Sequence, residues 1–353
     1  MLIEELLATL PPIRRVDRQW IARAEARQLS LTKPPGSLGR LEEIANRVAA
    51  IQQTLTPTIG AAQVIVFAGD HGVTAEGVAP YPSAVTAQMV TNFLAGGAAI
   101  NALAAVAGAG VTVVDIGVAA DAPPVTGVHG RRIAQGTKNF AHESAMTSEE
   151  VLAALAVGIE QGLNAATRVD MIGLGEMGIG NSTAASAITA VLTGLPPTLV
   201  TGRGTAADDD MVRRKIAVIT EALKQRRPDA RDALDVLAKV GGLEIAGLVG
   251  VVLAGAATRR VIVTDGFIAT AAAALAVRLC PETQDYLFAA HRSVEPGHAA
   301  LLELIGQEPL LDLRMRLGEG TGAALAFTVI RAAVAAFTRM ATFASAGVSD
   351  RPA

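Results

Sequence analysis

The sequence predicts an α/β protein built on a parallel sheet that is flanked by helices. Several short runs of mostly β-branched residues end in glycine-rich loops, and helical stretches follow them. These runs do not alternate between apolar and polar residues, so both faces of each strand should be covered, as in βαβ units. Half of the 353 residues are apolar (51%) and 18% are charged, which favours a large buried core and excludes a disordered chain.

The first 60 residues predict helices without strands. A helical stretch begins with the apolar residues at 3–7 and continues through 13–20 after a break at Pro11-Pro12. A loop at 33–39 follows. A second amphipathic helix runs from Arg40 to about Gln53, with apolar residues at helical spacing.

Five strands are predicted from residue 61 onward: Val64–Phe67, Val111–Ile116, Val169–Leu174, Arg260–Val263 and Tyr286–Phe288. Ligands of such folds bind at the carboxyl ends of the strands, so the loops that follow these runs are candidate sites.

Two apolar segments complete the pattern. Ile245–Ala257 is the longest unbroken apolar run, and its 13 residues are too few to span a bilayer, so we expect a buried helix. A long apolar helix is expected from Thr321 to about Phe343, and a surface loop at 121–126. We therefore expect a small helical domain from residues 1–60 plus 321–353 and a large α/β domain from 61–320.

Composition disfavours several classes of protein. The net charge of −3, the aromatic content of 3% and the lack of a basic run disfavour nucleic-acid binding. The single Cys280 excludes a disulfide framework within the chain and any CxxC metal site. The first ten residues contain Glu4 and Glu5 where a signal peptide has basic residues. We expect a soluble cytoplasmic protein without a membrane segment.

The richest loop lies at 173–183 and predicts a phosphate site. Repeated glycine lets the backbone approach an anion, and the following helix offers free N–H groups at its N-terminus. The alternative is that these glycines only form a tight turn and allow close packing. Gly173, Gly175 and Gly178 match the dinucleotide fingerprint, but no Asp or Glu occurs from Met177 to Ala207 to hold a ribose. The loop therefore favours a single phosphate.

Lys215 and Ser293 are candidate partners of that phosphate. Taken alone, Lys215 is more typical of a solvated helix lysine, and Ser293 of a structural serine. A cation and a hydroxyl donor are nevertheless what a phosphate requires.

Glu319 stands among Gly318, Gly320 and Gly322 at the start of the C-terminal helix. Apolar neighbours would raise its pKa and suit it to general-base catalysis. The alternative is an acid at a helix N-terminus that the dipole stabilises, and spacing alone does not decide. Asp70-His71 is a possible acid–base pair, although adjacent side chains often point apart. The sequence contains neither HExxH nor GxSxG.

Several long motifs resemble those of the nicotinate-nucleotide–dimethylbenzimidazole phosphoribosyltransferases. They run in the order of that family from about residue 5 to residue 340, and they are the stretches at 33–41, 67–73, 86–90, 96–101, 175–183, 202–205 and 318–322. One position departs from the family pattern, because Ala206 replaces the last glycine of Gly-Arg-Gly-Thr-Gly.

The resemblance implies transfer of phosphoribose from nicotinate mononucleotide to 5,6-dimethylbenzimidazole, which gives nicotinate and α-ribazole 5′-phosphate with inversion at C1′. It also implies a Rossmann-like large domain, a small helical domain from both chain ends, and a homodimer in which the partner completes the site. It implies no metal or redox cofactor.

The resemblance also suggests roles for individual residues. Glu319 is the expected general base, and Glu176 is a second acid near the ribose and base. The expected phosphate ligands are Gly178, Gly180, Asn181, Lys215 and Ser293. The expected dimethylbenzimidazole slot is lined by Tyr81, Pro82, Gln88, Met177 and Leu317. Gly202 is also expected to bind substrate.

Two other classes stay open at this point. A dinucleotide-dependent oxidoreductase of the Rossmann type would bind NAD, and the absence of a ribose-binding acid argues against it. A non-catalytic nucleotide-binding protein would not require a base, which Glu319 would supply.

Overall fold

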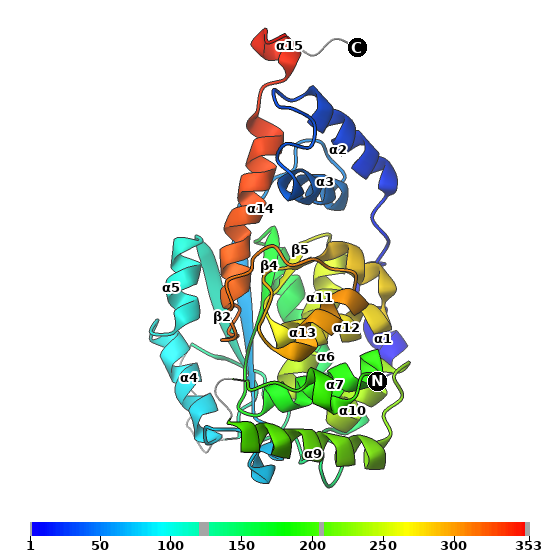
Figure 1. Cartoon of the computed structure of the whole chain (residues 1–353), viewed down its shortest axis with the longest axis vertical. Coiled ribbons are helices and arrows are strands. Elements are labelled where there is room, and N and C mark those ends of the chain that lie inside the picture. The colour runs from blue at the N-terminus through cyan, green and yellow to red at the C-terminus, as the bar shows by residue number, and fades with distance from the viewer. Residues whose placement is uncertain (1, 120–126, 205–207, 350–353) are drawn as a thin grey trace.

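A computed structural model describes residues 2–119, 127–204 and 208–349, and it contains a six-stranded parallel sheet (Figure 1). The strand order is β3-β2-β1-β4-β5-β6, and every neighbouring pair is parallel. The strands are β1 Ala62–Gly69, β2 Ala109–Gly117, β3 His129–Gly130, β4 Met171–Met177, β5 Val261–Thr264 and β6 Leu287–Ala289. The predicted α/β class is confirmed.

All five predicted strands are present, with bounds shifted by one to three residues. The exposed two-residue strand β3 is an addition, because a segment this short leaves no hydrophobic pattern in the sequence. The predicted loop at 121–126 lies outside the described residues.

The strand order places β1 and β4 side by side at the centre of the sheet. The chain first adds β2 and β3 on one side of β1, then returns to place β4, β5 and β6 on the other. This reversal opens a crevice beyond the carboxyl ends of the two central strands. The loops that begin at Asp70 and Gly178 are therefore at the position where such folds bind ligands.

Helices cover both faces of the sheet. One face carries α4 (Ala84–Leu94), α5 (Ala99–Val106) and α14 (Thr321–Arg339). The other face carries α6 (Ser148–Ala166), α11 (Leu243–Ala257) and α12 (Phe267–Leu279). The remaining helices of the middle of the chain are α7 Asn181–Thr193, α8 Pro197–Val200, α9 Asp209–Arg226, α10 Ala233–Val240 and α13 Pro296–Leu304, with 3₁₀ turns at Gly72–Glu76 and Pro281–Tyr286.

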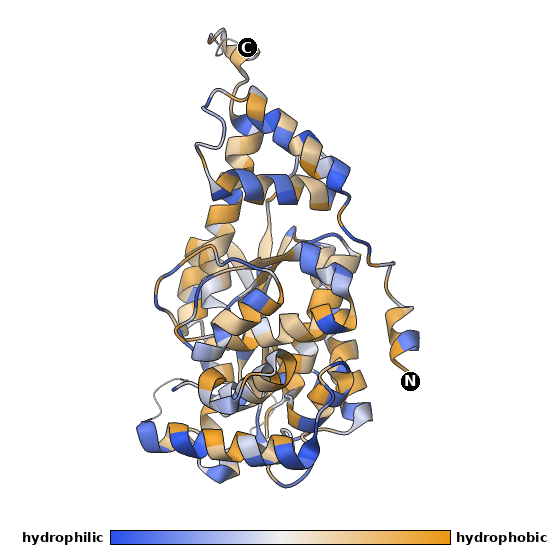
Figure 2. Ribbon diagram, turned by 45° about the vertical axis from the view of Figure 1, so that its right-hand side comes forward, coloured by the Kyte–Doolittle hydropathy of each residue, from blue (hydrophilic) through white to orange (hydrophobic). Residues whose placement is uncertain are grey.

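The buried helix predicted at 245–257 is confirmed as α11, which lies between the sheet and α6. Glycines allow these two helices to approach closely. A methyl group at Gly158 of α6 would overlap the carbonyl oxygen of Gly247 of α11. Figure 2 shows hydrophobic residues gathered around the sheet and hydrophilic ones on the outlying helices.

The terminal helices are α1 (Ile3–Leu7), α2 (Arg18–Ser30), α3 (Arg40–Gln52) and α15 (Phe343–Ala346). α2, α3 and the later part of α14 pack together at one end of the molecule (Figure 1), whereas α1 lies against α6. The second predicted helical stretch begins only at Arg18, where the Asp17 carboxylate caps the N-terminus by accepting from Gln19 N. The division into two domains stays a prediction.

Among the residues that the structure describes, two segments are apolar and long enough to cross a membrane by length and composition, namely Ala84–Val106 and Thr321–Arg339. The first is interrupted between α4 and α5. The second is α14. Its most apolar stretch is 56% buried against the rest of the chain, as is typical of a core helix.

The contact between α6 and α11 gives a test of the packing. We expect Gly158→Ala to lower the free energy of unfolding by about 1–3 kcal/mol, the usual cost of overpacking, because the added methyl meets backbone that cannot turn away. Denaturant unfolding followed by circular dichroism measures the change. Gly130→Ala, which places a methyl in open space, should be neutral. Equal effects of the two substitutions would contradict the packing argument.

Candidate active site

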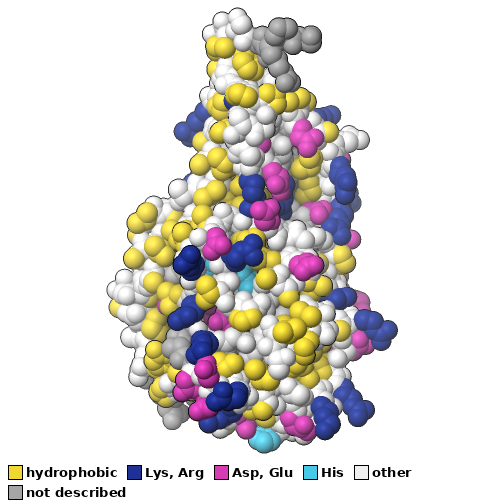
Figure 3. Space-filling model, in the orientation of Figure 1, with side chains coloured by type: hydrophobic (Ala, Val, Ile, Leu, Met, Phe, Trp, Pro, Cys, Tyr) yellow, Lys and Arg dark blue, Asp and Glu magenta, His cyan; other side chains and the backbone are white. Residues whose placement is uncertain are grey.

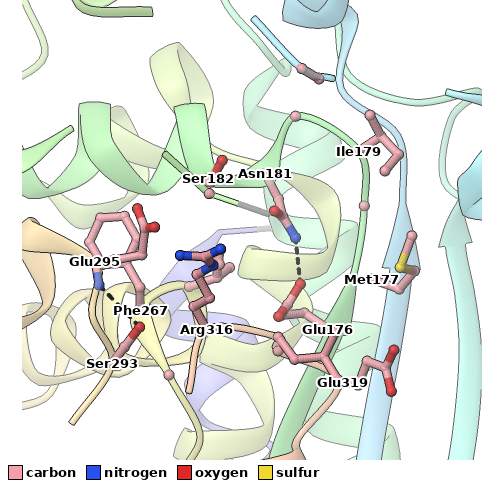
Figure 4. A pocket seen from close by; sticks show the side chains of 18 of the residues that line it. Glu176, Met177, Ile179, Asn181, Ser182, Phe267, Ser293, Glu295, Arg316 and Glu319 are labelled. Carbon is pink, nitrogen blue, oxygen red and sulfur yellow. Dashed lines mark hydrogen bonds between the residues drawn. The ribbon is translucent and has the colours of Figure 1, made fainter. Parts of the chain in front are cut away.

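A cavity of about 590 Å³ lies at the carboxyl ends of the central strands. Its lining comes from the loop after β4, the loops after β5 and β6, the segment before α14, and helices α4 and α5. On the face of the molecule shown in Figure 3, basic and acidic side chains are interspersed. In Figure 4, Ser293 and Glu295 lie at one side of the cavity, Met177 and Glu319 at the other, and Glu176 and Arg316 between them.

The glycine turn that follows β4 is fixed by the chain beneath it. A methyl group at Gly178 would overlap the carbonyl oxygen of Gly69 at the end of β1. Gly180 has φ +98° and forms the N-cap of α7. The close packing considered as the alternative for this loop is therefore present. The turn also lines the cavity, and it points the N-terminus of α7 toward it.

Lys215 is buried at 1% exposure, so the expectation of a solvated helix lysine is wrong. α9 packs on α7 and directs the ammonium group inward, where Nζ donates to Ser182 Oγ at 2.9 Å and to the Gly202 carbonyl at 3.4 Å. Burial lowers the pKa of this lysine to about 8, although the Glu295 carboxylate acts in the opposite direction. A buried cation at a helix N-terminus is a strong anion site.

Ser293 faces the same end of the cavity. Its N–H donates to His298 Nδ1 at 2.9 Å, and its hydroxyl oxygen accepts from Glu295 N at 3.3 Å. His298 is held in turn by Thr270 at 2.9 Å, and burial lowers its pKa to about 3. The neutral imidazole therefore serves as an acceptor and fixes the backbone of Ser293, whose side chain lines the cavity.

Glu295 was not predicted as part of the site. It lines the cavity at 7% exposure, and burial raises its pKa while Lys215 lowers it. A methyl group at Gly202 would overlap its carboxylate, which explains a glycine at that position. The only signal in the sequence is its place two residues after Ser293, directly before the first turn of α13.

Glu319 occupies a conformation that a side-chain-bearing residue seldom adopts. Its φ is +64°, between Gly318 at +88° and Gly320 at +86°. Asp265 holds this loop by accepting from Gly320 N at 3.0 Å and from Gly322 N at 2.6 Å. Left-handed backbone at a non-glycine residue costs energy and is typical of functional sites.

The environment of Glu319 combines two opposing effects. Burial, together with the nearby Asp265 carboxylate, raises the pKa of Glu319, whereas the N–H of Ile100 lowers it by donating to Oε2 at 3.2 Å. Ile100 belongs to the first turn of α5. The net shift is upward, so the carboxylate is a stronger proton acceptor than an exposed one.

Glu176 is the second acid of the cavity. Burial and the neighbouring Asp265 raise its pKa to about 8, which keeps most of this carboxyl group protonated at neutral pH. It accepts a short hydrogen bond from the Asn181 side chain (Figure 4). The cavity therefore contains two buried acids, Glu176 and Glu319, and the pKa of each is raised above its ordinary value.

Part of the cavity lining is apolar. Tyr81, Met177 and Leu317 of the predicted slot belong to it, together with Val85, Met89 and Leu103 of α4 and α5, which were not predicted. Of the remaining predicted slot residues, Pro82 and Gln88 are exposed and do not line the cavity. Gln88 lies on α4 beside Met89, on a face of the helix turned outward.

The structure thus brings together most of the predicted residues from distant parts of the chain. Those that line the cavity are Tyr81, Glu176, Met177, Gly178, Gly180, Asn181, Lys215, Ser293, Leu317 and Glu319. Gly202 contacts Lys215 through its carbonyl without lining the cavity. Ala206 lies outside the described residues. Asp70 and His71 do not line the cavity either.

Other residues of the cavity also escaped sequence reasoning, among them Phe267, His291 and Arg316. Phe267 and His291 follow β5 and β6, and Arg316 precedes the Glu319 loop. His291 lies 3.6 Å from Asp265 and has a raised pKa because the attraction of that carboxylate exceeds the effect of burial. Within the described ranges, no three His, Cys, Asp or Glu side chains are placed to hold a metal ion.

The side chains that line the cavity fall into groups that suit different parts of a ligand. A buried cation, a helix N-terminus and a hydroxyl suit a phosphate at one end, and an apolar wall suits a flat ring at the other. A carboxylate with a raised pKa stands beside the apolar end, where it can take a proton from a ring nitrogen.

The chain is similar to known proteins over nearly its whole length. A family model described as "Phosphoribosyltransferase" matches residues 13–348. A nicotinate-nucleotide–dimethylbenzimidazole phosphoribosyltransferase of Geobacter sp. (strain M21) is 53% identical over 350 residues, 99% of each chain. One of Chloroflexus aurantiacus is 52% identical over 345 residues, 98% of each chain.

Solved structures agree with these relatives. The crystal structure of CobT from Thermus thermophilus has a TM-score of 0.90 at 48% identity, covering 94% of this chain and 99% of that one. These similarities do not favour the dinucleotide-dependent oxidoreductase. The chain belongs to the phosphoribosyltransferase family whose members are named nicotinate-nucleotide–dimethylbenzimidazole phosphoribosyltransferases.

Proposed function

We propose that this enzyme transfers phosphoribose from nicotinate mononucleotide to 5,6-dimethylbenzimidazole. The products are nicotinate and α-ribazole 5′-phosphate, the nucleotide of the cobalamin lower ligand. The names of the relatives support these substrates. We also propose that the reaction inverts C1′ and takes place in the cytoplasm, without a metal or redox cofactor.

The main support is the position and state of Glu319. This carboxylate lies on the same side of the cavity as Met177, across from Ser293 and Glu295 (Figure 4). Its raised pKa suits it to accept a proton. A flat, methylated bicycle fits an apolar wall, and its N–H is the only acidic group that it presents.

The proposed step conserves atoms and charge. The unprotonated ring nitrogen of dimethylbenzimidazole forms a bond to C1′. The bond from C1′ to the pyridinium nitrogen breaks, and its electron pair neutralises the departing nicotinate ring. The N–H of the attacking ring becomes strongly acidic as the new bond forms, and Glu319 takes that proton.

Glu176 and the phosphate ligands complete the proposal. A protonated Glu176 adds no second negative charge beside Glu319, and it can donate a hydrogen bond to a ribose hydroxyl. Lys215, Asn181, Ser293 and the turn at 178–180 are proposed to hold the phosphate, as their arrangement at the N-terminus of α7 favours.

Incubation with both substrates tests the activity directly. Purified enzyme should release nicotinate from nicotinate mononucleotide only when dimethylbenzimidazole is present. Chromatography should detect α-ribazole 5′-phosphate in equal amount. Release of nicotinate without the second base, or tight binding of NAD with no transfer, would refute the proposal.

Replacing Glu319 by Gln tests the general base. The amide keeps the shape but cannot accept the proton, so kcat should fall by about 10²–10⁴ while both KM values change far less. The kcat of the wild type should fall as pH decreases through the pKa of Glu319, above the ordinary glutamate value. Glu319→Gln should lack this acid limb.

A melting curve like that of the wild type is the control for folding. A folded Glu319→Gln enzyme within about threefold of wild-type kcat would exclude this base, on the general-base magnitude above. Glu176 would then be tested by the same substitution.

Replacing Lys215 by Arg tests the phosphate cation through pH. The lowered pKa of about 8 means that the free enzyme loses this charge as pH rises through that value, so kcat/KM for nicotinate mononucleotide should fall there. Arginine stays charged, so in Lys215→Arg the alkaline limb should become less steep, because only the loss of the Glu176 proton, whose pKa is also about 8, remains. An alkaline limb as steep as that of the wild type would exclude Lys215 as its cause.

We further propose that a second copy of this chain covers α4 and α5. The segment Ala84–Val106 is strongly apolar, yet only 28% of its most apolar stretch is buried within one chain. Val106 is 85% exposed. The same helices supply Val85, Met89 and Leu103 to the cavity, so a partner on this face would meet the apolar end of the site.

Val106→Asp tests the dimer. A charge on the proposed interface should shift the protein toward the monomer in sedimentation velocity and reduce turnover, with recovery at high protein concentration. Val348→Asp, the same substitution at an exposed residue near the C-terminus, should change neither the oligomeric state nor the turnover. An active wild-type monomer at assay concentration would contradict the proposal.

A further inference from the structure

The segment Asp70-His71 lies outside the cavity, and His71 forms a buried ion pair with Glu244 of α11. His71 Nε2 lies 2.7 Å from Glu244 Oε1, and both side chains are fully buried. His71 follows β1, and Glu244 is in the first turn of α11. Asp70 does not share this pair, because its carboxylate accepts from Ala119 N at 2.8 Å. The two adjacent side chains therefore point to different partners.

The charge state of this pair follows from its surroundings. Burial acts against a charged His71, but the Glu244 and Asp70 carboxylates outweigh it and raise its pKa above the ordinary histidine value. The hydrogen bond is thus donated by an imidazole Nε2–H to a carboxylate. Such pairs in the core are seldom kept for stability alone, because taking both charges out of water is costly.

The imidazole ring of His71 lies directly behind the glycine turn at 178–180. A methyl group at Gly178 would stand 3.5 Å from His71 Cδ2, and one at Gly180 would stand 3.1 Å from His71 Cβ. On the opposite side, a methyl at Gly242 would lie 2.5 Å from His71 Cε1. The ring is therefore enclosed between the turn and the start of α11, and Glu244 fixes its orientation.

A second contact holds the middle of the same turn. Thr86 of α4 is fully buried, and its Oγ1 accepts from Ile179 N at 3.2 Å. Thr86 also lies beside the Asp70 carboxyl group, whose pKa burial raises and this hydroxyl lowers. The turn is thus supported from α11 through His71 and from α4 through Thr86.

We propose that His71, oriented by Glu244, and Thr86 are positioning residues that hold the turn at 178–180 in the geometry that binds the substrate phosphate. The inference rests on the proposed function, in which this turn contacts the phosphate of nicotinate mononucleotide. None of the three side chains lines the cavity. Their effect is transmitted through the backbone of Gly178, Ile179 and Gly180.

The physical argument concerns preorganisation. Backbone N–H groups bind an anion well only if they already converge on it, since a displacement of about 1 Å can cost up to 100-fold. A turn that contains two glycines does not hold such a geometry by itself, because glycine populates many backbone conformations. A rigid histidine ring and a hydroxyl acceptor supply the restraint from behind.

The decisive measurement compares the two substrates in His71→Asn and Thr86→Val. Each should raise KM for nicotinate mononucleotide by about tenfold or more, within the range expected for a displaced contact. KM for dimethylbenzimidazole should stay within about threefold, since the apolar end of the cavity is untouched. Inorganic phosphate, used as a competitive inhibitor, should lose affinity by the same factor as nicotinate mononucleotide.

Conservative variants separate positioning from general destabilisation. Thr86→Ser keeps the acceptor for Ile179 N, and Glu244→Gln keeps an acceptor for His71 Nε2–H, so both should remain near wild type. His142→Asn is the matched control, because it removes another His–Glu contact, 3.0 Å long and exposed, between His142 and Glu76. It should leave every constant unchanged.

The outcomes are distinct. Equal loss of affinity for both substrates, or unchanged inhibition by inorganic phosphate, in folded His71→Asn or Thr86→Val would overturn the positioning role. If His71→Asn does not fold, Thr86→Val against Thr86→Ser decides the question alone. If the wild type lacks transferase activity, the proposed function fails instead, and calorimetric binding of inorganic phosphate to the same variants still tests the support of the turn.

Discussion

The site depends on one close contact, in which the loop at 318–320 lies on the backbone of the central strand β4. A methyl group at Gly175 would stand 2.7 Å from the Glu319 carbonyl oxygen, and one at Gly320 would overlap the side chain of Val64 in β1. Asp265, at the end of β5, draws the loop onto the sheet with two hydrogen bonds. The last segment of the chain is thereby placed over the first and middle strands, and Glu319 enters the cavity that they form.

This contact has an electrostatic consequence. Asp265, Glu176 and Glu319 are brought together in a region largely shielded from water, where carboxylates repel one another and are poorly solvated. The pKa of Glu176 rises to about 8, and that of Glu319 also rises. The N–H of Ile100, in the first turn of α5, donates to the Glu319 carboxylate and limits the rise of its pKa. The fold thus produces one carboxyl that is mainly protonated and one that can act as an acceptor.

The phosphate end follows a different principle. Here a buried ammonium group and backbone N–H groups offset negative charge. The side chains that orient those N–H groups, His71 and Thr86, lie behind the turn and do not line the cavity. The two ends of the cavity are consequently held by largely different elements, and α4 contributes to both. α9, α7, the end of β1 and Thr86 of α4 serve the phosphate end, while Val85 and Met89 of α4, α5 and the segment before α14 serve the apolar end.

The sequence by itself determined the class of fold, because unalternated β-branched runs require a sheet that is covered on both faces, and all five of the strands it predicted exist. It also pointed to Gly178, Gly180 and Glu319, since a run of glycines before a helix, or an acid among glycines, is a local signal. The motifs of the loops, through family resemblance, added Glu176 and the expected reaction.

Only the tertiary structure decided which of these residues meet. Burial of Lys215 depends on how α9 packs against α7, which no local pattern encodes, and the exposed position of Gln88 depends on the orientation of α4. His291 and Arg316 carry no local signal, and Glu295 has only its place before α13, because these residues enter the cavity through proximity across the chain. The partnership of His71 with Glu244 joins residues 173 positions apart, and its physical basis is a buried distance that sequence spacing does not contain.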